Sequence, residues 1–275
     1  MMDRRLTPAN GRVAAETLRG HVVADAFVTG EPAQVLPPVT DLCRAPAGPR
    51  ERQLLLGAGV TVYERRSGWA FVQAQADGYV GYVAEAALGP AREPTHMVAT
   101  AATHLYDAED MKSRDLMGLS FGSRVTVLAE GRRFWETAEG FIPKPHLRPL
   151  DRPFSDPVTV AQLHFGVPYL WGGNSIRGID CSGLVQAALR ACAIACPGDS
   201  DMQRAAVGVD LPEGAAPARG DLWFWTGHVG MVVDADTLLH ANAHHMAVAY
   251  EPLVKAAARI AAQGDGPVIA RKRLR

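Results

Sequence analysis

The 275-residue sequence predicts an α+β fold, in which a segment of helices and strands follows two small β-modules. Short apolar runs separated by turn residues occupy residues 35–90, and a similar series follows residue 94, which is typical of small all-β barrels. Beyond residue 157 a helical stripe precedes two adjacent strands. We therefore expect three domains: an N-terminal extension with the first module at 1–90, the second module at 91–150, and the helix-and-sheet domain at 151–275.

The two β-modules form an internal repeat. Val60–Val62 corresponds to Val125–Val127 at an offset of 65 residues, and Trp69 corresponds to Trp135 at an offset of 66. Self-similarity at a nearly constant offset indicates duplication of one supersecondary unit. The closing strands extend the match, with Tyr82-Val83 aligned to Phe141-Ile142.

The third domain begins after a Pro-rich stretch, residues 145–157, which predicts a linker. Residues 159–165 predict a short helix with Thr159 as its cap. Apolar positions 184, 185, 188, 189 and 192 predict a second helix over 180–192. Strands are expected at 229–233 and 237–241, joined by a tight turn, and at 268–270, followed by a solvated basic tail.

The composition excludes several classes of protein. Hydrophobic residues make up 48% and charged residues 21% of the chain, which is ordinary for a globular protein. The 28 basic and 29 acidic residues give a net charge of -1, so no basic field attracts nucleic acid. No segment approaches the roughly 18 uninterrupted apolar residues of a membrane span. Neither nucleic acid nor a membrane is an expected partner.

The cysteines argue against a scaffold of disulfides or zinc. Cys43, Cys181, Cys192 and Cys196 are few for this length, and their spacing contains no paired C-x-x-C units. His244 and His245 follow His240 closely, but no carboxylate or cysteine stands at ligand spacing with them. The basic N-terminus lacks an apolar segment behind it. We expect a reduced, cytoplasmic monomer without metal or cofactor.

Cys181 is the most informative residue. It stands at the first turn of the predicted helix, after Asp180 at the capping position and the Gly-rich stretch 171–175. Backbone N–H groups and the helix dipole stabilise a thiolate there, so the pKa of the thiol is expected to be lowered. Asp180 is equally well explained as an N-cap alone.

Two histidines can complete a catalytic triad. His228 begins the strand at 229–233, and His240 lies on the next strand, 12 residues later. Antiparallel pairing of these strands places the rings side by side, so that His240 accepts the proton of His228 and sets its tautomer. A lone cysteine or histidine is usually core filling or surface, but here the three residues occur in order within about 70 residues.

The segment from about residue 159 onward resembles the NlpC-type family of papain-like cysteine peptidases, on the motifs Pro168-Tyr169-x-Trp171-Gly172-Gly173, Asp180-Cys181-Ser182-Gly183 and His228-Val229-Gly230. The repeated Gly-Trp and Gly-Tyr strands resemble bacterial SH3-type domains. Together they are similar to γ-D-glutamyl-L-diamino acid endopeptidases of the dipeptidyl-peptidase VI type. The resemblance implies a peptidoglycan stem peptide as substrate, cut between γ-D-Glu and diaminopimelate or lysine.

The resemblance also implies the role of each residue. Cys181 is the expected nucleophile, His228 the base, His240 its orienting partner, and Tyr169 supports the oxyanion with the backbone N–H of Cys181. The substrate brings an ammonium and a carboxylate, which need an acid and hydrogen-bond donors. The expected substrate-binding residues are Asp199 for the ammonium, Ser200 and Ser182 for the carboxylate, Asp180, Trp171, and Tyr79 and Glu51 from the first module, where Glu31 and Glu64 are alternatives to Glu51. Gly198 replaces an Arg frequent in the family, which weakens the carboxylate assignment.

A closed groove formed with the first module would exclude intact wall and accept released peptides, which favours recycling in the cytoplasm. Three alternatives remain open: a lysin that cuts intact peptidoglycan, an amidase or acyltransferase on another amide, and an inert binding module. The intact Cys-His-His set argues against the last of these.

Overall fold

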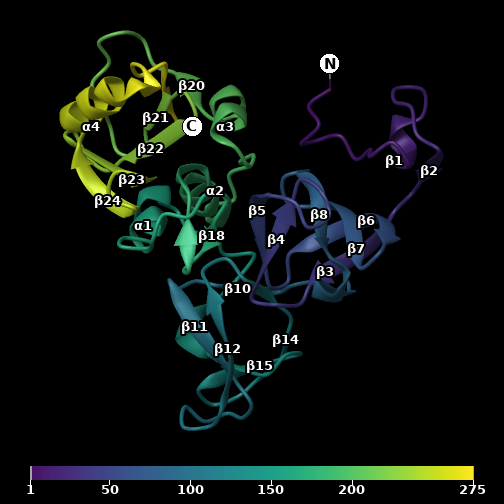
Figure 1. Cartoon of the computed structure of the whole chain (residues 1–275). Coiled ribbons are helices and arrows are strands. Elements are labelled where there is room, and N and C mark those ends of the chain that lie inside the picture. Colours follow the sequence, from purple (N-terminus) through teal and green to yellow (C-terminus); the bar gives the residue numbers. More distant parts are fainter. Residues whose placement is uncertain (1, 275) are drawn as a thin grey trace. The chain divides into compact units, whose positions relative to one another are not determined.

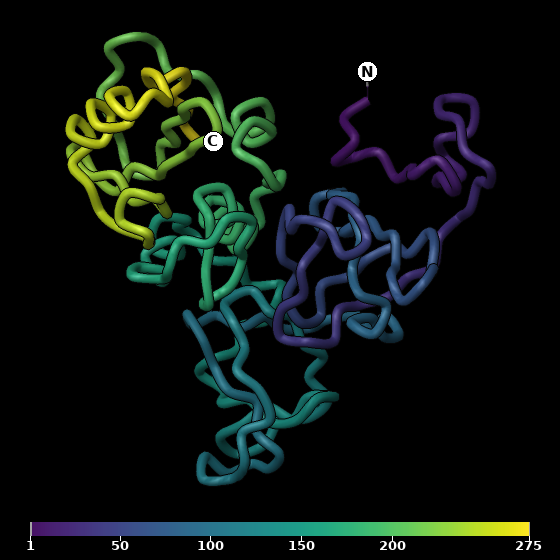
Figure 2. Tube along the Cα trace, viewed as in Figure 1, coloured from purple at the N-terminus to yellow at the C-terminus, as the bar shows by residue number. Residues whose placement is uncertain are grey.

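A computed structural model describes residues 2–274, and the chain divides into two compact units, Met1–Leu150 and Asp151–Arg275 (Figure 1). Strands outnumber helices in both units. Figure 2 traces the backbone from the N-terminus in purple to the C-terminus in yellow. Each unit is described here by itself.

The first unit opens with a parallel pair of short strands, β1 (Val13–Ala15) and β2 (Ala26–Val28), with η1 (Glu16–Leu18) between them. A seven-stranded sheet follows. In sheet order its strands are β5 (Arg50–Leu55), β4 (Val39–Cys43), β8 (Val80–Ala84), β7 (Trp69–Ala74), β6 (Gly59–Arg66), β3 (Glu31–Val35) and β9 (Leu88–Pro90), with η2 (Glu85–Ala87) before β9.

The remainder of the first unit forms a three-stranded and a five-stranded sheet. The three-stranded sheet contains β13 (Arg124–Val125), β10 (His96–Val98) and β17 (Leu147–Pro149). The five-stranded sheet contains β12 (Asp115–Ser120), β11 (Ala102–Tyr106), β16 (Phe141–Pro143), β15 (Phe134–Thr137) and β14 (Val127–Glu130), and η3 (Lys144–His146) precedes β17.

The strand pairing of the first module recurs in the second. β3 pairs with β6 and β9, as β10 pairs with β13 and β17. β4 pairs with β5 and β8, as β11 pairs with β12 and β16. β7 joins β6 to β8, as β15 joins β14 to β16. Among the described residues neither module closes into a barrel by strand pairing, because β5 and β9 remain edges of the first sheet.

The two β-modules share a core. Leu56, between β5 and β6, is buried with Val98, Leu105 and Ile142 of the second module. The backbones also meet there, because Arg124 donates its N–H to the Leu56 carbonyl at 2.9 Å. A side chain at Gly57, where φ is +72°, would collide with the carbonyl of Arg124. This shared core explains why residues 1–150 form one compact unit; the expected boundary at residue 90 remains a prediction.

The second unit begins with α1 (Pro157–Gln162), which differs from the helix expected at 159–165. Asp156, not Thr159, caps it, because its carboxylate accepts the N–H of Val158 at 3.0 Å. Pro157 stands at the first helical position, where no helical hydrogen bond needs the backbone N–H that proline lacks. Thr159 instead donates its hydroxyl to Asp156. α2 (Cys181–Ala191) and α3 (Ser200–Ala206) follow, and the small hairpin of β18 (Asn174–Ser175) and β19 (Gly178–Ile179) lies between α1 and α2 in sequence.

A six-stranded antiparallel sheet completes the second unit. In sheet order it contains β20 (Val209–Asp210), β25 (Ala270–Arg273), β21 (Leu222–Trp225), β22 (His228–Val232), β23 (Thr237–Asn242) and β24 (Ala247–Pro252). α4 (Leu253–Ile260) continues into the π-helical turn η4 (Ala261–Asp265). α4 packs beside the sheet (Figure 1), with Leu253, Ala256 and Ile260 buried against Trp225, Val232 and Leu238.

The basic C-terminus is not the solvated tail expected from sequence. β25 lies inside the sheet, between β20 and β21. Arg273 makes two hydrogen bonds of 2.8 Å to the fully buried carboxylate of Asp221. The burial of an acidic residue that needs a partner therefore explains the run of basic residues.

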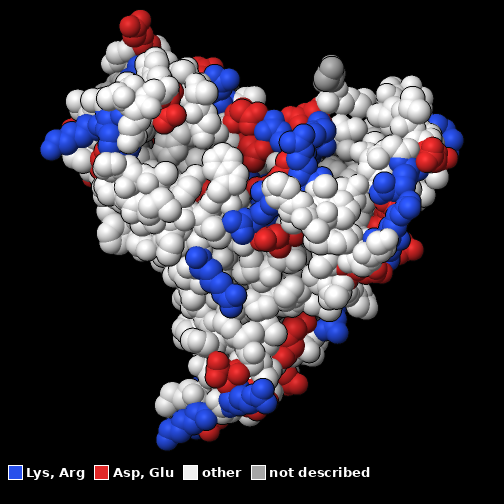
Figure 3. Space-filling model, viewed as in Figure 1, with Lys and Arg blue, Asp and Glu red and all other residues white. Residues whose placement is uncertain are grey.

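No helix within residues 2–274 is long and apolar enough to cross a membrane. Basic and acidic side chains are interspersed on the face shown in Figure 3, in agreement with the nearly balanced charge of the chain.

Candidate active site

Cys181 is the first residue of α2, and Asp180 is its N-cap. The Asp180 carboxylate accepts three hydrogen bonds, from the N–H groups of Gly172 (2.9 Å) and Gly183 (2.7 Å) and from the hydroxyl of Ser182 (3.0 Å). Gly183 fits closely here, because a side-chain carbon would lie 2.6 Å from the carbonyl of Gly173. The motif Asp-Cys-Ser-Gly thus fixes the loop before the helix, and this bonding favours the capping interpretation of Asp180 over a direct substrate contact.

The thiol of Cys181 does not have the lowered pKa that we expected from its place on the helix. Burial and, secondly, the charge of Asp180 raise the pKa to about 12, whereas the N–H groups of Val229, Ser182 and Cys181 itself lower it by less. Only 7% of the residue is exposed. Loss of solvation outweighs the helix dipole at this depth, so Cys181 rests as a neutral thiol.

His228 and His240 lie side by side on the neighbouring strands β22 and β23. Nε2 of His228 lies 2.8 Å from Nδ1 of His240, and the ring centres are 5.1 Å apart. A two-residue turn ending at Gly227, where φ is +72°, places His228 opposite Trp225, whose ring lies 5.6 Å away. The Val229 N–H that interacts with the thiol belongs to the residue after His228. The nucleophile and the histidine pair therefore meet at the start of β22.

A buried ion pair that we did not expect from sequence extends the histidine pair. Nε2 of His240 lies 3.1 Å from the Glu251 carboxylate, which also accepts two bonds from Arg259, at 2.9 and 2.7 Å. Leu238 is the register partner of Glu251, and Ala249 that of His240, so Glu251 and His240 are diagonal neighbours on one face. The sequence carries no signal for this contact, because only the register of β24 against β23 shows which glutamate lies beside His240.

Burial keeps both histidines neutral. It lowers the pKa of His228 to about 3, with further lowering by the charges of His240 and Arg259. It lowers the pKa of His240 to about 4, against the opposing effect of Glu251. Hydrogen bonds from Arg259 hold the pKa of Glu251 at about 2. The resting site therefore combines a neutral thiol, two neutral imidazoles and one carboxylate.

These shifts predict loss of stability in acid. An unfolded histidine titrates near pH 6.5. Below about pH 6.5, His228 and His240 therefore bind protons in the unfolded chain but not in the folded protein. The free energy of unfolding falls as the pH decreases, until the pH reaches their folded pKa values. Each group contributes at most about 1.4 kcal/mol per pH unit. Thermal or urea unfolding between pH 7.5 and 5 should show a shallower decline for His240→Gln than for the wild type. The exposed His244→Gln is the control; equal slopes for all three proteins would contradict the assignment.

Tyr169 and Trp171 lie on the loop before Asp180. Burial raises the pKa of Tyr169 above its usual range, with smaller contributions from the charges of Cys181 and Asp180, so the phenol stays a hydrogen-bond donor near the nucleophile. This agrees with a donor to an oxyanion. Trp171 is 69% exposed and offers an apolar surface next to the loop. Both roles remain predictions.

The residues expected to bind the substrate carboxylate and ammonium lie around α2 and α3. Ser182 is buried and already donates its hydroxyl to Asp180, which leaves its oxygen as an acceptor rather than a donor for a carboxylate. Ser200 begins α3 and is partly exposed. Asp199 occupies the N-cap position of α3 without a capping bond from its side chain. Gln203 ties the two helices together by donating to the carbonyls of Ser182 (2.9 Å) and Pro197 (3.0 Å).

Tyr79 and Glu51 belong to the first unit. Tyr79 is buried, with the guanidinium of Arg52 over its ring at 5.7 Å. The carboxylate of Glu51 is paired with both terminal nitrogens of Arg4. Glu64, another acidic candidate, is held by Arg12 and Asn10. Arg4 therefore already occupies part of the Glu51 carboxylate.

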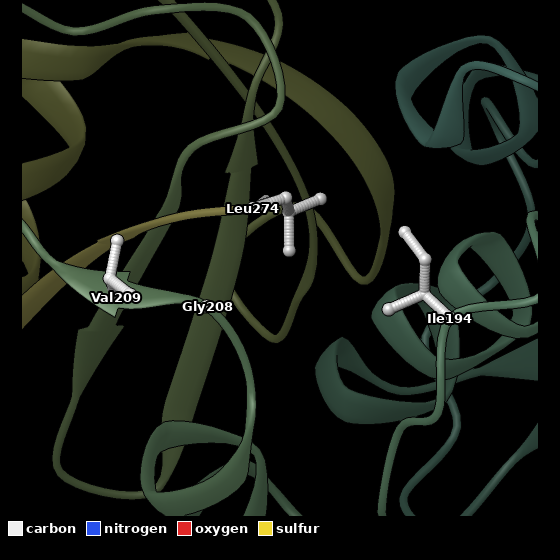
Figure 4. Close-up of a pocket in the computed structure, with 4 residues that line it drawn as sticks. All are labelled: Ile194, Gly208, Val209 and Leu274. Atoms are coloured by element: carbon white, nitrogen blue, oxygen red, sulfur yellow. The ribbon is translucent and has the colours of Figure 1, made fainter.

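A hollow of about 250 Å³ in the second unit is lined by Ile194, Gly208, Val209 and Leu274 (Figure 4). None of these is a predicted site residue, and the lining offers no charged group. Within residues 2–274 no group of three or more His, Cys, Asp or Glu side chains is arranged to hold a metal ion.

Comparison with known families agrees with this geometry. Residues 166–259 match the NlpC/P60 family, and residues 42–88 match the bacterial dipeptidyl-peptidase Sh3 domain. The chain therefore carries an NlpC/P60 domain after a bacterial SH3 domain. With Cys181 at the helix start and the histidine pair on the sheet, the protein is a papain-like cysteine peptidase, a hydrolase.

Two curated proteins are similar to most of this chain. The chain is 26% identical to a γ-D-glutamyl-L-lysine dipeptidyl-peptidase of Bacillus cereus over 238 residues, which is 74% of this chain and 70% of the relative. It is 26% identical over 219 residues to the protein of the same name from Bacillus subtilis, covering 70% of this chain and 72% of that one. A crystal structure of an NlpC/P60 family protein from Bacillus cereus has the same fold, with a TM-score of 0.74 and 20% identity over 89% of this chain and 99% of that one.

Proposed function

We propose that this peptidase hydrolyses the bond between γ-D-Glu and meso-diaminopimelate or lysine in peptidoglycan stem peptides with a free N-terminal L-Ala. The observation that carries the proposal is the Cys181 nucleophile beside the 2.8 Å His228–His240 pair, in a chain whose curated relatives are named for γ-D-glutamyl-L-lysine cleavage. The bond is an amide through the side-chain carboxyl of Glu. A thiol can attack its carbonyl carbon as it does that of a peptide bond, so that sulfur becomes acylated and the amine leaves.

The reaction follows from the protonation states of the site. His228 takes the proton of Cys181 as sulfur attacks the γ-carbonyl carbon, and the oxyanion receives hydrogen bonds from Tyr169 and the N–H at the start of α2. The protonated His228 then gives its proton to the leaving amine. Water, activated by the same imidazole, hydrolyses the acyl-enzyme and restores the thiol.

We further propose that residues 91–150 are a second SH3-like module. The recurrence of every pairing of the first module supports this, as does the offset of 65 to 66 residues between Val60, Trp69 and their counterparts.

Recycling in the cytoplasm, by a monomer acting on released peptides, is part of the same proposal. It rests on the free amine as a recognition element, with Asp199 as the acid that binds it. A lysin acting on intact peptidoglycan is the main alternative, and an amidase or acyltransferase on another amide is the second.

Three substrates separate these functions. We expect cleavage of L-Ala-γ-D-Glu-diaminopimelate, or of its lysine analogue, with release of the L-Ala-γ-D-Glu dipeptide detected by mass spectrometry. The N-acetylated peptide should react at least about tenfold more slowly, since it lacks the ammonium that a carboxylate would pair with. Purified cell walls should release no soluble peptide. Equal rates on the free and acetylated peptides would contradict recycling, and no cleavage of any of the three would overturn the proposed substrate.

A further inference from the structure

The ion pair beyond the histidines is more than a structural bridge. Glu251 is on β24 and Arg259 is on α4, eight residues apart. Arg259 donates a hydrogen bond to each carboxylate oxygen of Glu251. Oε2 of Glu251 also lies 3.1 Å from Nε2 of His240. The histidine side chain is fully buried, and Glu251 is 8% exposed. Besides Arg259, the described contacts of this carboxylate include only His240, so its role is to orient that histidine.

The carboxylate determines the tautomer of each ring in turn. An ionised carboxylate only accepts hydrogen bonds, so Nε2 of His240 must carry a hydrogen. Because His240 is neutral, its Nδ1 then holds a lone pair and accepts from Nε2–H of His228 across 2.8 Å. Nδ1 of His228 is consequently the unprotonated nitrogen, which is the one required of a base.

We propose that Glu251, held by Arg259, is a positioning residue that sets the tautomers of His228 and His240 and leaves Nδ1 of His228 as the base for Cys181. When the thiol S–H bond breaks and an N–H bond forms at Nδ1, the positive charge on His228 is stabilised through His240 by the carboxylate. No proton passes to Glu251. The inference rests on the peptidase chemistry of the site and not on which peptide is cleaved.

Other charged groups that act on His240 do not compete for this role. Arg259 and His245 oppose a positive charge on His240, whereas Glu251 favours it. His245 is exposed and is bonded instead to Asn242, at 2.8 Å through its N–H. Glu251 is the acidic group acting on both rings among the described residues.

Glu251→Gln tests the proposal, because the amide removes the charge and can present a donor to His240. We expect kcat on the cleaved peptide to fall about tenfold or more, with KM within about twofold, since the Glu251 side chain is nearly buried. The rate of Cys181 alkylation by iodoacetamide at pH 7, localised by peptide mass spectrometry, should fall by a similar factor. Glu251→Asp, which keeps the charge, should recover part of both rates.

Glu16→Gln is the matched control, because Glu16 is held by Arg19 in the same two-bond geometry in the first unit. It should leave kcat and alkylation unchanged. Alkylation does not depend on the substrate, so a protein that alkylates normally but cleaves no γ-D-Glu peptide contradicts the proposed function and leaves the role of Glu251 testable. Wild-type rates of both reactions in folded Glu251→Gln would overturn the inference.

A measurement on the unmodified protein covers the case in which Glu251→Gln fails to fold. In ¹⁵N-histidine-labelled protein at pH 7, the ring nitrogen shifts should show His228 and His240 both protonated at Nε2 and unprotonated at Nδ1. A hydrogen on Nδ1 of His228 would overturn the proposal.

Discussion

Replacing Cys181 with Ala should lower turnover by a factor of about 10⁴ or more, to the level that binding and the oxyanion donors alone provide. The methyl group cannot form the acyl-enzyme, so the reaction loses its covalent step. Initial rates on the peptide that the wild type cleaves measure the loss. Thermal unfolding should change little, because the thiol makes few bonds that a methyl group lacks.

Cys192→Ala is the control for this prediction. Cys192 is the C-cap residue of α2, at the far end of the helix that Cys181 begins, and like Cys181 it is not part of a disulfide. The variant should keep the wild-type rate. Retained turnover in Cys181→Ala would remove this residue from the role of nucleophile.

Replacing His228 with Ala should lower kcat by about 10²- to 10⁴-fold near neutral pH, the usual contribution of a general base. The remaining reaction needs the thiolate formed without help, and burial holds the pKa of Cys181 at about 12. The rate of the variant should therefore rise about tenfold per pH unit through the alkaline range. Wild-type activity should instead stay nearly constant from pH 5 to 8, because the pKa of His228 is lowered to about 3.

His244→Gln serves as the comparison, because this exposed histidine follows β23 and its ring contacts that of His245, not the rings of His228 or His240. Its pH profile should overlay that of the wild type. A wild-type profile that falls with a midpoint near pH 6.5 would mean that a solvated histidine is the base, and a flat profile in His228→Ala would remove His228 from proton transfer.

The pKa of the Cys181 thiol is where the expectation from local sequence and the effect of the folded structure differ most. A cysteine at a helix start suggests a thiolate, because the dipole and N–H groups favour negative charge. In the folded protein Cys181 is nearly excluded from water and stands beside the Asp180 carboxylate. Burial first, and then the interaction with Asp180, raise the pKa of the thiol. Proton transfer to His228 must then accompany attack rather than precede it.

Local pattern alone was sufficient for the elements of the site. The stripe at 184–192 and the two runs around Asp234–Asp236 led to α2, β22 and β23, because side-chain period reports which face is buried. The same runs indicated that His228 and His240 would be neighbours, since a tight turn leaves one possible partner strand. The repeated β-pattern likewise follows from sequence, as the pairing of both modules shows.

Only the tertiary structure decided the remainder. Glu251 reaches His240 through the register of β24, and Arg259 reaches Glu251 from α4, and no local pattern encodes either contact. The same holds for Arg273, which β25 brings to Asp221 across 52 residues of chain. Burial and charge pairing depend on residues distant in sequence, so periodicity determines which groups face inward, whereas only the packed fold determines which charges meet and what pKa values they acquire.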